Sequence, residues 1–528
     1  MNKEIAERTV VGLHRRYPAS RTAKDGVALE LARVNGRRRL VVVMPAEVFP
    51  QGLEVESELE SAQWHGHWGN PGHAPERQSG TGERIGVCPL SAHNAAWMRE
   101  HWPMLAPCTN PGIAVSIGLG DRLGKASAGH LHALEGMAVF PVLAQQSMRE
   151  LKLTGRTYEE VLDAATWAVF ETGWRGGYGA DGDHLKTPEE IDYALRCGFT
   201  MITLDCSDHI DKALANLSEE EVRERYLLLG EGERLELESL YLGVNDGMQE
   251  GAEPRHSGRT GGTLQELGIL MDRPGFERRV LTYRDAIAHA VDICRTRIQT
   301  AGRPVDYEIS IDETATVTSP ADHAFVALEL LRHHVRFISL APRFCGEFQK
   351  GIDYRGDIGG FRAAFKDHAR IARKLGYRLS VHSGSDKFLV FPIIGEEAPE
   401  GFHLKTAGTN WLEALRVLAT HEPVLFRTIL SAALASLEEA RRFYHVSGIA
   451  ANIPPAESLG DLQLPGLLDQ DDARQILHIT YGHVLKTVLD DGGTLGDRIH
   501  AALDGLEDEY SDGLRRHLQR HLDVLKLD

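Results

Sequence analysis

The sequence has few cysteines, no long apolar run and no excess of positive charge. Its 528 residues include six cysteines without CxxC spacing, which argues against a zinc ribbon or a disulfide framework and favours a reducing compartment. No run reaches the roughly 18 apolar residues of a membrane span, and the N-terminus lacks an apolar stretch of signal-peptide length. We therefore predict a cytoplasmic protein.

The charge balance is strongly acidic. A formal net charge of −18 argues against binding to nucleic acid or to an anionic membrane surface, because both require a basic face. Hydrophobic residues make up 42% and charged residues 25% of the chain, as in ordinary soluble enzymes. An anionic substrate of so acidic a protein would therefore need its own local cations.

Short β-rich runs alternate with helix-length amphipathic segments from residue 111 to 410, the region predicted to be catalytic. Eight strands alternating with helices predict an α/β fold built on a closed (β/α)8 barrel. An open doubly wound sheet is the alternative, but no GxGxxG or P-loop follows the first strand. The predicted strands cover residues 114–118, 137–142, 179–184, 200–205, 306–313, 336–341, 378–382 and 402–406.

Three further regions flank or interrupt this pattern. Residues 1–110 are predicted to form an N-terminal accessory α/β region, with a strand at 39–44 and a helix-like segment at 54–63. A helical insertion is predicted at about 212–280, and residues 411–528 are predicted to form a C-terminal helical region compatible with a homo-oligomer. The N-terminal His65, His67 and His73 lie in a Gly-rich run that fits a surface loop better than a metal site.

Polar residues at the carboxyl ends of barrel strands converge on one active site. His184, His382 and His403 are assigned to the ends of three different predicted strands and have carboxylates nearby. Such a set predicts a site for a divalent cation (Zn, Mn, Ni or Co) with an open position for a substrate oxygen. The alternative is that each histidine is a hydrogen-bonded core or rim residue.

Two carboxylates on different predicted strands, Asp183 and Glu313, are predicted to act as base and acid on the two faces of a substrate. Asp312 is the alternative to Glu313, and both could instead be helix caps or ion-pair partners. Lys405 could also be read as a Schiff-base lysine. The residues predicted to bind substrate, several of them cations suited to a sugar acid, are Arg122, Gln146, Asp205, Arg343, Glu347, Lys387 and Lys405.

Six motifs in chain order resemble the tagaturonate/fructuronate epimerase family, some members of which are called tagatose 4-epimerases. They are YGADGDHLK, FTMITLDCSDHID, ISIDETATVTSP, EFQKGIDYRGD, LSVHSGSDKF and FHLKTAGT. The resemblance implies a metal-dependent barrel isomerase that interconverts D-tagaturonate and D-fructuronate, and in some members D-tagatose and D-fructose at C4. Carried over by motif, it implies His184, His382 and His403 as metal ligands and Asp183 and Glu313 as acid and base.

The implied reaction inverts a carbon β to the ketone, whose hydrogen is not acidic, so simple enolisation cannot exchange it. A retro-aldol route would solve this problem: a carboxylate takes a hydroxyl proton, the C–C bond opens, the aldehyde rotates and the bond re-forms on its other face. Proton transfer at carbon is the alternative route. The alternative functions are a metal-dependent aldolase that releases its fragments and a non-catalytic sugar-binding barrel, which would need fewer titratable groups.

Overall fold

The computed structural model of the chain describes residues 13–47, 52–59, 83–242, 264, 266–314 and 316–527. The chain divides into two compact units, one comprising Met1–Pro107 with Glu159–Gly177 and the other Cys108–Tyr158 with Tyr178–Asp528. None of the described helices is both long enough and apolar enough to cross a lipid bilayer.

The first unit contains a five-stranded antiparallel sheet in the order β1-β2-β3-β5-β4. Its two tight hairpins turn at Asp25-Gly26 and Asn35-Gly36, where all four residues have positive φ, as two-residue turns between twisted strands require. Helix α2 (Ala92–His101) follows the sheet, and most of α5 (Tyr158–Thr172) belongs to the same unit. The strands are β1 (Leu13–Lys24), β2 (Val27–Val34), β3 (Arg37–Pro45), β4 (Ser57–Leu59) and β5 (Glu83–Cys88).

The strand predicted at 39–44 is confirmed as β3. The prediction of a helix-like segment at 54–63 is wrong over residues 54–59, the part that the structure describes. Ser57–Leu59 forms β4, which pairs with β5. The segment is extended because Leu59 is buried in the apolar face of the sheet beside Ile85. The three histidines of the Gly-rich run lie outside the described residues.

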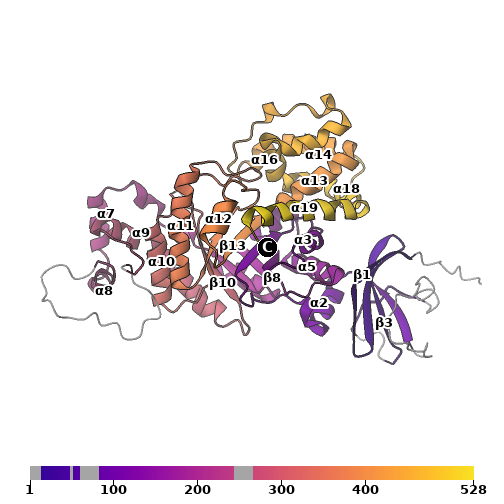
Figure 1. The fold of residues 1–528 in the computed structure, drawn as a ribbon, viewed down its shortest axis with the longest axis horizontal. Helices are drawn as coiled ribbons and strands as arrows, with labels where there is room; N and C mark the ends of the chain where they lie inside the picture. The colour runs from indigo at the N-terminus through magenta and orange to yellow at the C-terminus, as the bar shows by residue number, and fades with distance from the viewer. Residues whose placement is uncertain are drawn as a thin grey trace, which may run out of the picture. The chain divides into compact units, whose positions relative to one another are not determined.

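The second unit contains a closed barrel of eight parallel strands (Figure 1). The circle closes because β13 pairs with β6, which confirms the predicted barrel and excludes the open sheet. Every residue of β6, β7, β9 and β11 is buried, as expected for parallel strands covered by helices. The strands are β6 (Val115–Gly120), β7 (Val139–Ser147), β8 (Gly179–Leu185), β9 (Met201–Asp205), β10 (Asp306–Ile311), β11 (Ser339–Pro342), β12 (Arg378–Val381) and β13 (Phe402–Ala407).

Local sequence explains where the outer helices begin. Thr187 and Ser319 each start a helix with a capping box and a proline in the first turn. The segment predicted as an insertion contains α7 (Glu219–Leu227) and α8 (Glu231–Tyr241), while residues 266–272 are turn or irregular. The other helices of the barrel region are α3 (Ser127–Ala133), α4 (Met148–Thr154), α6 (Pro188–Arg196), α9 (Arg273–Ile293), α10 (Pro320–Arg332), α11 (Ile358–Leu375) and α12 (Phe391–Glu397).

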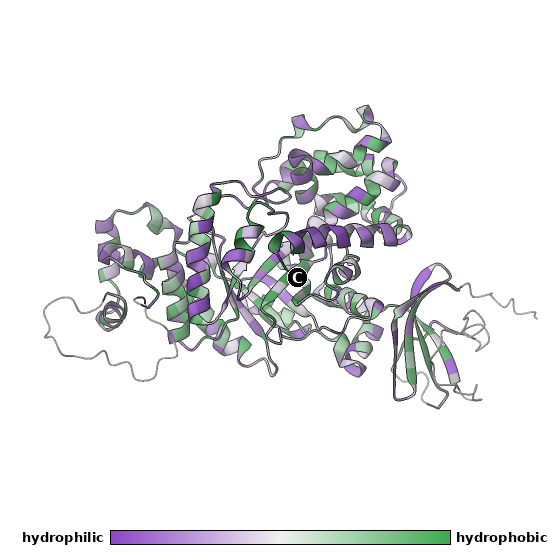
Figure 2. Ribbon diagram, in the orientation of Figure 1, coloured by the Kyte–Doolittle hydropathy of each residue, from purple (hydrophilic) through white to green (hydrophobic). Residues whose placement is uncertain are grey.

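The C-terminal part is helical, as predicted, and has its own apolar core around Trp411, Phe426 and Ile476. The last helix buries Leu514, Leu518 and similar residues on one side, while Figure 2 shows hydrophilic residues along its viewed side. The helices are α13 (Thr409–His421), α14 (Pro423–Ala435), α15 (Leu437–Ala440), α16 (Asp471–Ile479), α17 (Tyr481–Lys486), α18 (Leu495–Gly505) and α19 (Glu507–Leu525).

Candidate active site

A cavity of about 220 Å³ opens at the carboxyl ends of the barrel strands. Residues at the ends of β7, β8 and β13, from the loops after β10, β11 and β12, and from residues 443–445 line it. Larger hollows include one between α8, α9 and α10, one between α13 and α19, and one lined by residues 441–446, which shares residues 443–445 with this cavity. We take the smaller cavity as the candidate active site, because strand-end residues line it and active sites of (β/α)8 barrels lie there.

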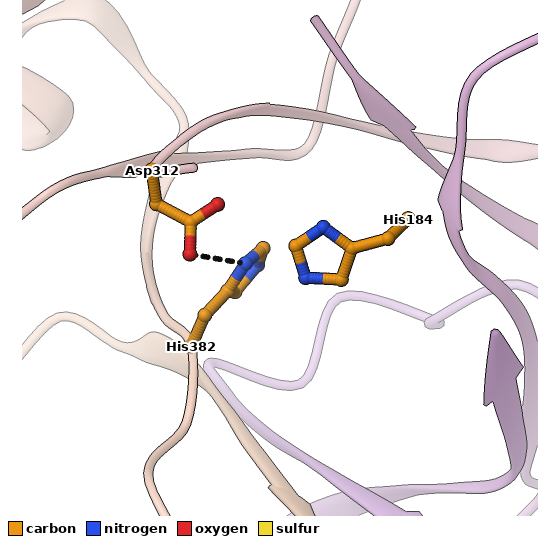
Figure 3. A group of neighbouring side chains, drawn as sticks. All are labelled: His184, Asp312 and His382. Carbon is orange, nitrogen blue, oxygen red and sulfur yellow. Dashed lines mark ion pairs between the residues drawn. The ribbon is translucent and has the colours of Figure 1, made fainter. Parts of the chain in front are cut away.

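His184, His382 and Asp312 form the centre of this site (Figure 3). The two imidazole rings meet edge to face with centroids 4.7 Å apart, and Asp312 Oδ2 lies 3.2 Å from His382 Nδ1. One side-chain donor atom from each of the three lies within 4.8 Å of the others. Asp205 and Glu313 form a second such group with His184, which therefore belongs to both groups.

The backbone at His184 is held in an unfavourable conformation. His184 has φ +52°, and the pairing of β8 with β9 shifts register between Gly182 and Leu185. A left-handed non-glycine residue costs on the order of 1–3 kcal/mol and such residues cluster at functional sites. The irregularity turns the side chain of His184 into the cavity, as strand bulges often do beside active sites.

The donor atoms of this group fit a divalent cation. Three of them, His184 Nδ1, His382 Nδ1 and Asp205 Oδ2, are buried and make no well-aligned hydrogen bond to a described residue, although Asp312 Oδ2 lies 3.2 Å from His382 Nδ1 and Asp205 Oδ2 lies 3.7 Å from His184 Nδ1. Leaving such atoms unsatisfied costs about 1–3 kcal/mol each, and a shared cation would satisfy all three. Imidazole nitrogens with carboxylate oxygens are suitable ligands for Zn, Mn, Ni or Co.

The electrostatics of the group also favour a positive charge. Burial lowers the pKa of His382, but the negative charge of Asp312 raises it to about 10. Burial raises the pKa of Asp312, but His382 and His184 hold it well below its usual range. The carboxylates therefore stabilise a cation at this position, whether a proton or a metal ion.

Glu308, which the sequence analysis did not single out, orients His382 from inside the barrel. Its Oε1 lies 2.8 Å from His382 Nε2 and 3.0 Å from Lys405 Nζ. With Nε2 bonded to Glu308, Nδ1 of His382 is left to face Asp312 and the cavity. The sequence signal that could have identified Glu308 is the presence of a glutamate within the otherwise largely apolar strand segment YEISI.

Asp183 lines the cavity beside Lys405, whose Nζ lies 2.6 Å from Asp183 Oδ1. Burial raises the pKa of Asp183, but Lys405 holds it well below its usual range, so Asp183 is ionised. Lys405 also contacts Asp181 at 2.9 Å. Burial lowers the pKa of Lys405, but these carboxylates raise it well above its usual value. A lysine held protonated is unsuited to form a Schiff base.

His403 does not join His184 and His382. It is the second residue of β13, at the opposite end of the strand from the cavity, and its Nδ1 lies 2.9 Å from Ser116 Oγ. Burial lowers the pKa of His403 to about 3. Among the described residues it belongs to none of the three-donor groups. Lys405, two residues later on the same face, reaches the cavity instead.

The predicted substrate-binding residues divide into two sets. Lys405 lines the cavity, and Asp205 Oδ2 lies 3.7 Å from His184 Nδ1. The described cavity wall does not include the other five, Arg122, Gln146, Arg343, Glu347 and Lys387.

Two of these five are committed to structural contacts. Arg122 is buried, pairs with Glu150 at 3.2 Å and lies over the ring of Tyr481. Lys387 donates hydrogen bonds to three backbone carbonyls. The sequence pattern could not distinguish these contacts from a substrate site.

Several residues of the cavity wall were missed. Arg149 follows β7, and Lys350 lies within the motif EFQKGIDYRGD. Tyr444 and His445 were missed because residues 411–528 were predicted as a helical region away from the barrel, whereas α15 ends at Ala440 and the chain directly after it is not helical. The chain after it supplies residues 443–445 to the cavity.

Comparisons with known proteins agree over nearly the whole chain. A family model described as tagaturonate epimerase matches residues 65–525. The tagaturonate/fructuronate epimerase of Thermotoga maritima is 40% identical over 513 residues, 97% of this chain and 96% of that protein. Two crystal structures of the fructuronate-tagaturonate epimerase of Cohnella laeviribosi, one native and one with glycerol, each have 42% identity and a TM-score of 0.86, covering 98% of this chain and 97% of theirs.

Proposed function

This chain belongs to the tagaturonate epimerase family, and from that membership we infer that it is an isomerase that interconverts D-tagaturonate and D-fructuronate. The observation that carries the inference at residue level is the cavity, in which the His184, His382 and Asp312 group stands beside the ionised Asp183. A catalytic base next to a cation site is what an aldol-type reaction requires.

We assign His184, His382 and Asp312 as holders of a divalent cation, with Asp205 as a further donor on the side of His184. When bound, such a cation supplies Lewis-acid polarisation of the substrate's ketone and hydroxyl oxygens. Glu308 supports the assignment because it fixes the ring of His382 through Nε2.

Asp183 is the proposed base. The carbon to be inverted is β to the ketone, so its hydroxyl proton, and not its C–H, is the proton that a carboxylate can remove. Asp183 is ionised and held by Lys405 at 2.6 Å, which fixes its position and keeps it in the form that can accept a proton. Loss of this proton lets the adjacent C–C bond open to an aldehyde and an enediolate.

Glu313 is the proposed partner of Asp183. It lies on the cavity wall after β10, whereas Asp183 lies at the end of β8. After the aldehyde rotates, the bond re-forms on its other face and the new alkoxide needs a proton there. An aromatic side chain, Tyr444, is buried at the cavity wall and would help retain the aldehyde, which separates an epimerase from an aldolase.

The test is an assay of metal-stripped and metal-restored protein with D-fructuronate, D-tagaturonate, D-fructose and D-tagatose, with products followed by chromatography. We expect epimer formation that requires metal and is lost in His382→Ala. His421→Ala, at an exposed position on α13, is the matched control and should keep full activity. Net formation of three-carbon fragments would instead identify an aldolase, and no turnover by metal-loaded protein would contradict the proposal.

A further inference from the structure

Two cations on the cavity wall, Arg149 and Lys350, have no carboxylate partner. Neither makes an ion pair with any residue that the structure describes, although Lys350 Nζ lies 3.0 Å from Ser383 Oγ and the Arg149 guanidinium lies 5.0 Å from the ring centroid of Tyr444. The third cation of the wall, Lys405, contacts three carboxylates. Unpaired cations are notable in a protein with a net charge of −18, because carboxylates are abundant.

The arrangement around Arg149 explains why it stays unpaired. Glu150, its neighbour in sequence and also on the cavity wall, is paired with the buried Arg122 at 3.2 Å. Arg149 is therefore left to solvent and to the cavity. Its planar guanidinium can bind a carboxylate through two parallel hydrogen bonds.

Arg149 and Lys350 lie close enough to influence each other. Burial lowers the pKa of Lys350, and the positive charge of Arg149 lowers it further. Two like charges facing one cavity repel each other, and an anion bound between them would remove that repulsion.

We propose that Arg149 and Lys350 bind the carboxylate of the substrate and so select keto-uronates over neutral ketoses. This inference rests on the proposed function. In a six-carbon keto-uronate the inverted carbon lies midway along the chain between the ketone and the carboxylate. With the ketone at the histidine and carboxylate group and the carboxylate at Arg149 and Lys350, the inverted carbon lies between these two anchors.

The test compares kcat/KM for D-fructuronate and D-fructose in Arg149→Met, Lys350→Met and the double variant. A charge-assisted contact is worth about 1.5–3 kcal/mol, so each single variant should lose about 10- to 100-fold with fructuronate and stay within about twofold of wild type with fructose. Lys350→Arg keeps the charge and should retain most activity. Lys366→Met, at an exposed position on α11, is the control for the loss of one positive charge.

Calorimetric titration of the same proteins with D-fructuronate separates this inference from the proposed function, since binding needs no turnover. Binding that depends on both cations without epimerisation would support the subsite and contradict the epimerase. Epimerisation with unchanged fructuronate affinity in the double variant would overturn the subsite alone. An equal loss with both sugars, or no fructuronate binding by wild type, would also overturn it. Melting temperature and bound metal should stay at wild-type values in every variant.

Discussion

Nε2 of His382 lies 2.8 Å from Oε1 of Glu308, a residue of β10 that is completely buried in the barrel. This contact determines which nitrogen of His382 faces the cavity, because Nδ1 is then left on the side of Asp312. The carboxylate also accepts from Lys405 and Ser339. Glu308 is thus held in place by several contacts, and its hydrogen bond to Nε2 restricts the orientation of the His382 ring.

Replacing Glu308 with Gln should weaken metal binding without removing a ligand. Outer partners of this kind are worth about 10- to 100-fold in metal affinity, so we expect a shift of that size in a metal titration followed by calorimetry. Glu347→Gln, on the loop after β11 but outside the cavity wall, should bind metal as wild type does. Equal affinities in the two variants would show that Glu308 does not orient His382.

Asp183→Asn should abolish most turnover and leave the metal in place. Asn is nearly the same size but cannot accept a proton, and loss of a general base typically costs about 10²- to 10⁴-fold in rate. We expect kcat to fall by that factor, while the amount of metal bound per chain, measured by elemental analysis, stays equal to that of the wild-type protein. A variant that lost metal together with activity would place Asp183 among the ligands instead.

Isotope exchange distinguishes the two chemical routes. If the C–C bond opens, the hydrogen on the inverted carbon remains attached to that carbon throughout. Epimerisation in D₂O should then leave this position unlabelled, as seen by NMR of the recovered product. Deuterium at the inverted carbon would instead require proton transfer at carbon and would remove the retro-aldol route.

The barrel was predictable because each of its eight strands is a short apolar run followed by polar residues. The same pattern drew attention to His184 and His382, which line the cavity: His184 is the last but one residue of β8, and His382 directly follows β12. It failed at His403, which is the second residue of β13 both as predicted (402–406) and as observed (402–407), so it lies at the end of the strand away from the cavity. Arg149 and Arg122 show the other limit: both follow strands, and only the packing of Glu150 and Tyr481 decides which one reaches the cavity.

The final prediction concerns α19, which contacts the loop after β12 through an ion pair between His517 and Asp386. Asp386, in that loop, has φ +56° and its Oδ1 lies 3.0 Å from His517 Nε2, while its Oδ2 is paired with Arg474 of α16. The same loop carries Ser383, a residue of the cavity wall. The contact therefore supports the active site from outside.

This contact should make stability depend on pH. Burial lowers the pKa of His517, but Asp386 raises it above its ordinary value, so the stabilisation is complete below about pH 6.5 and is lost as pH rises through the folded-state pKa. Burial raises the pKa of Asp386, but His517 holds it well below its usual range, so that contribution is lost only in strong acid. His517→Gln should lower the melting temperature more at pH 5.5 than at pH 8.5, whereas the exposed His421→Gln should not. Equal losses at both pH values would mean that His517 contributes packing and no charge.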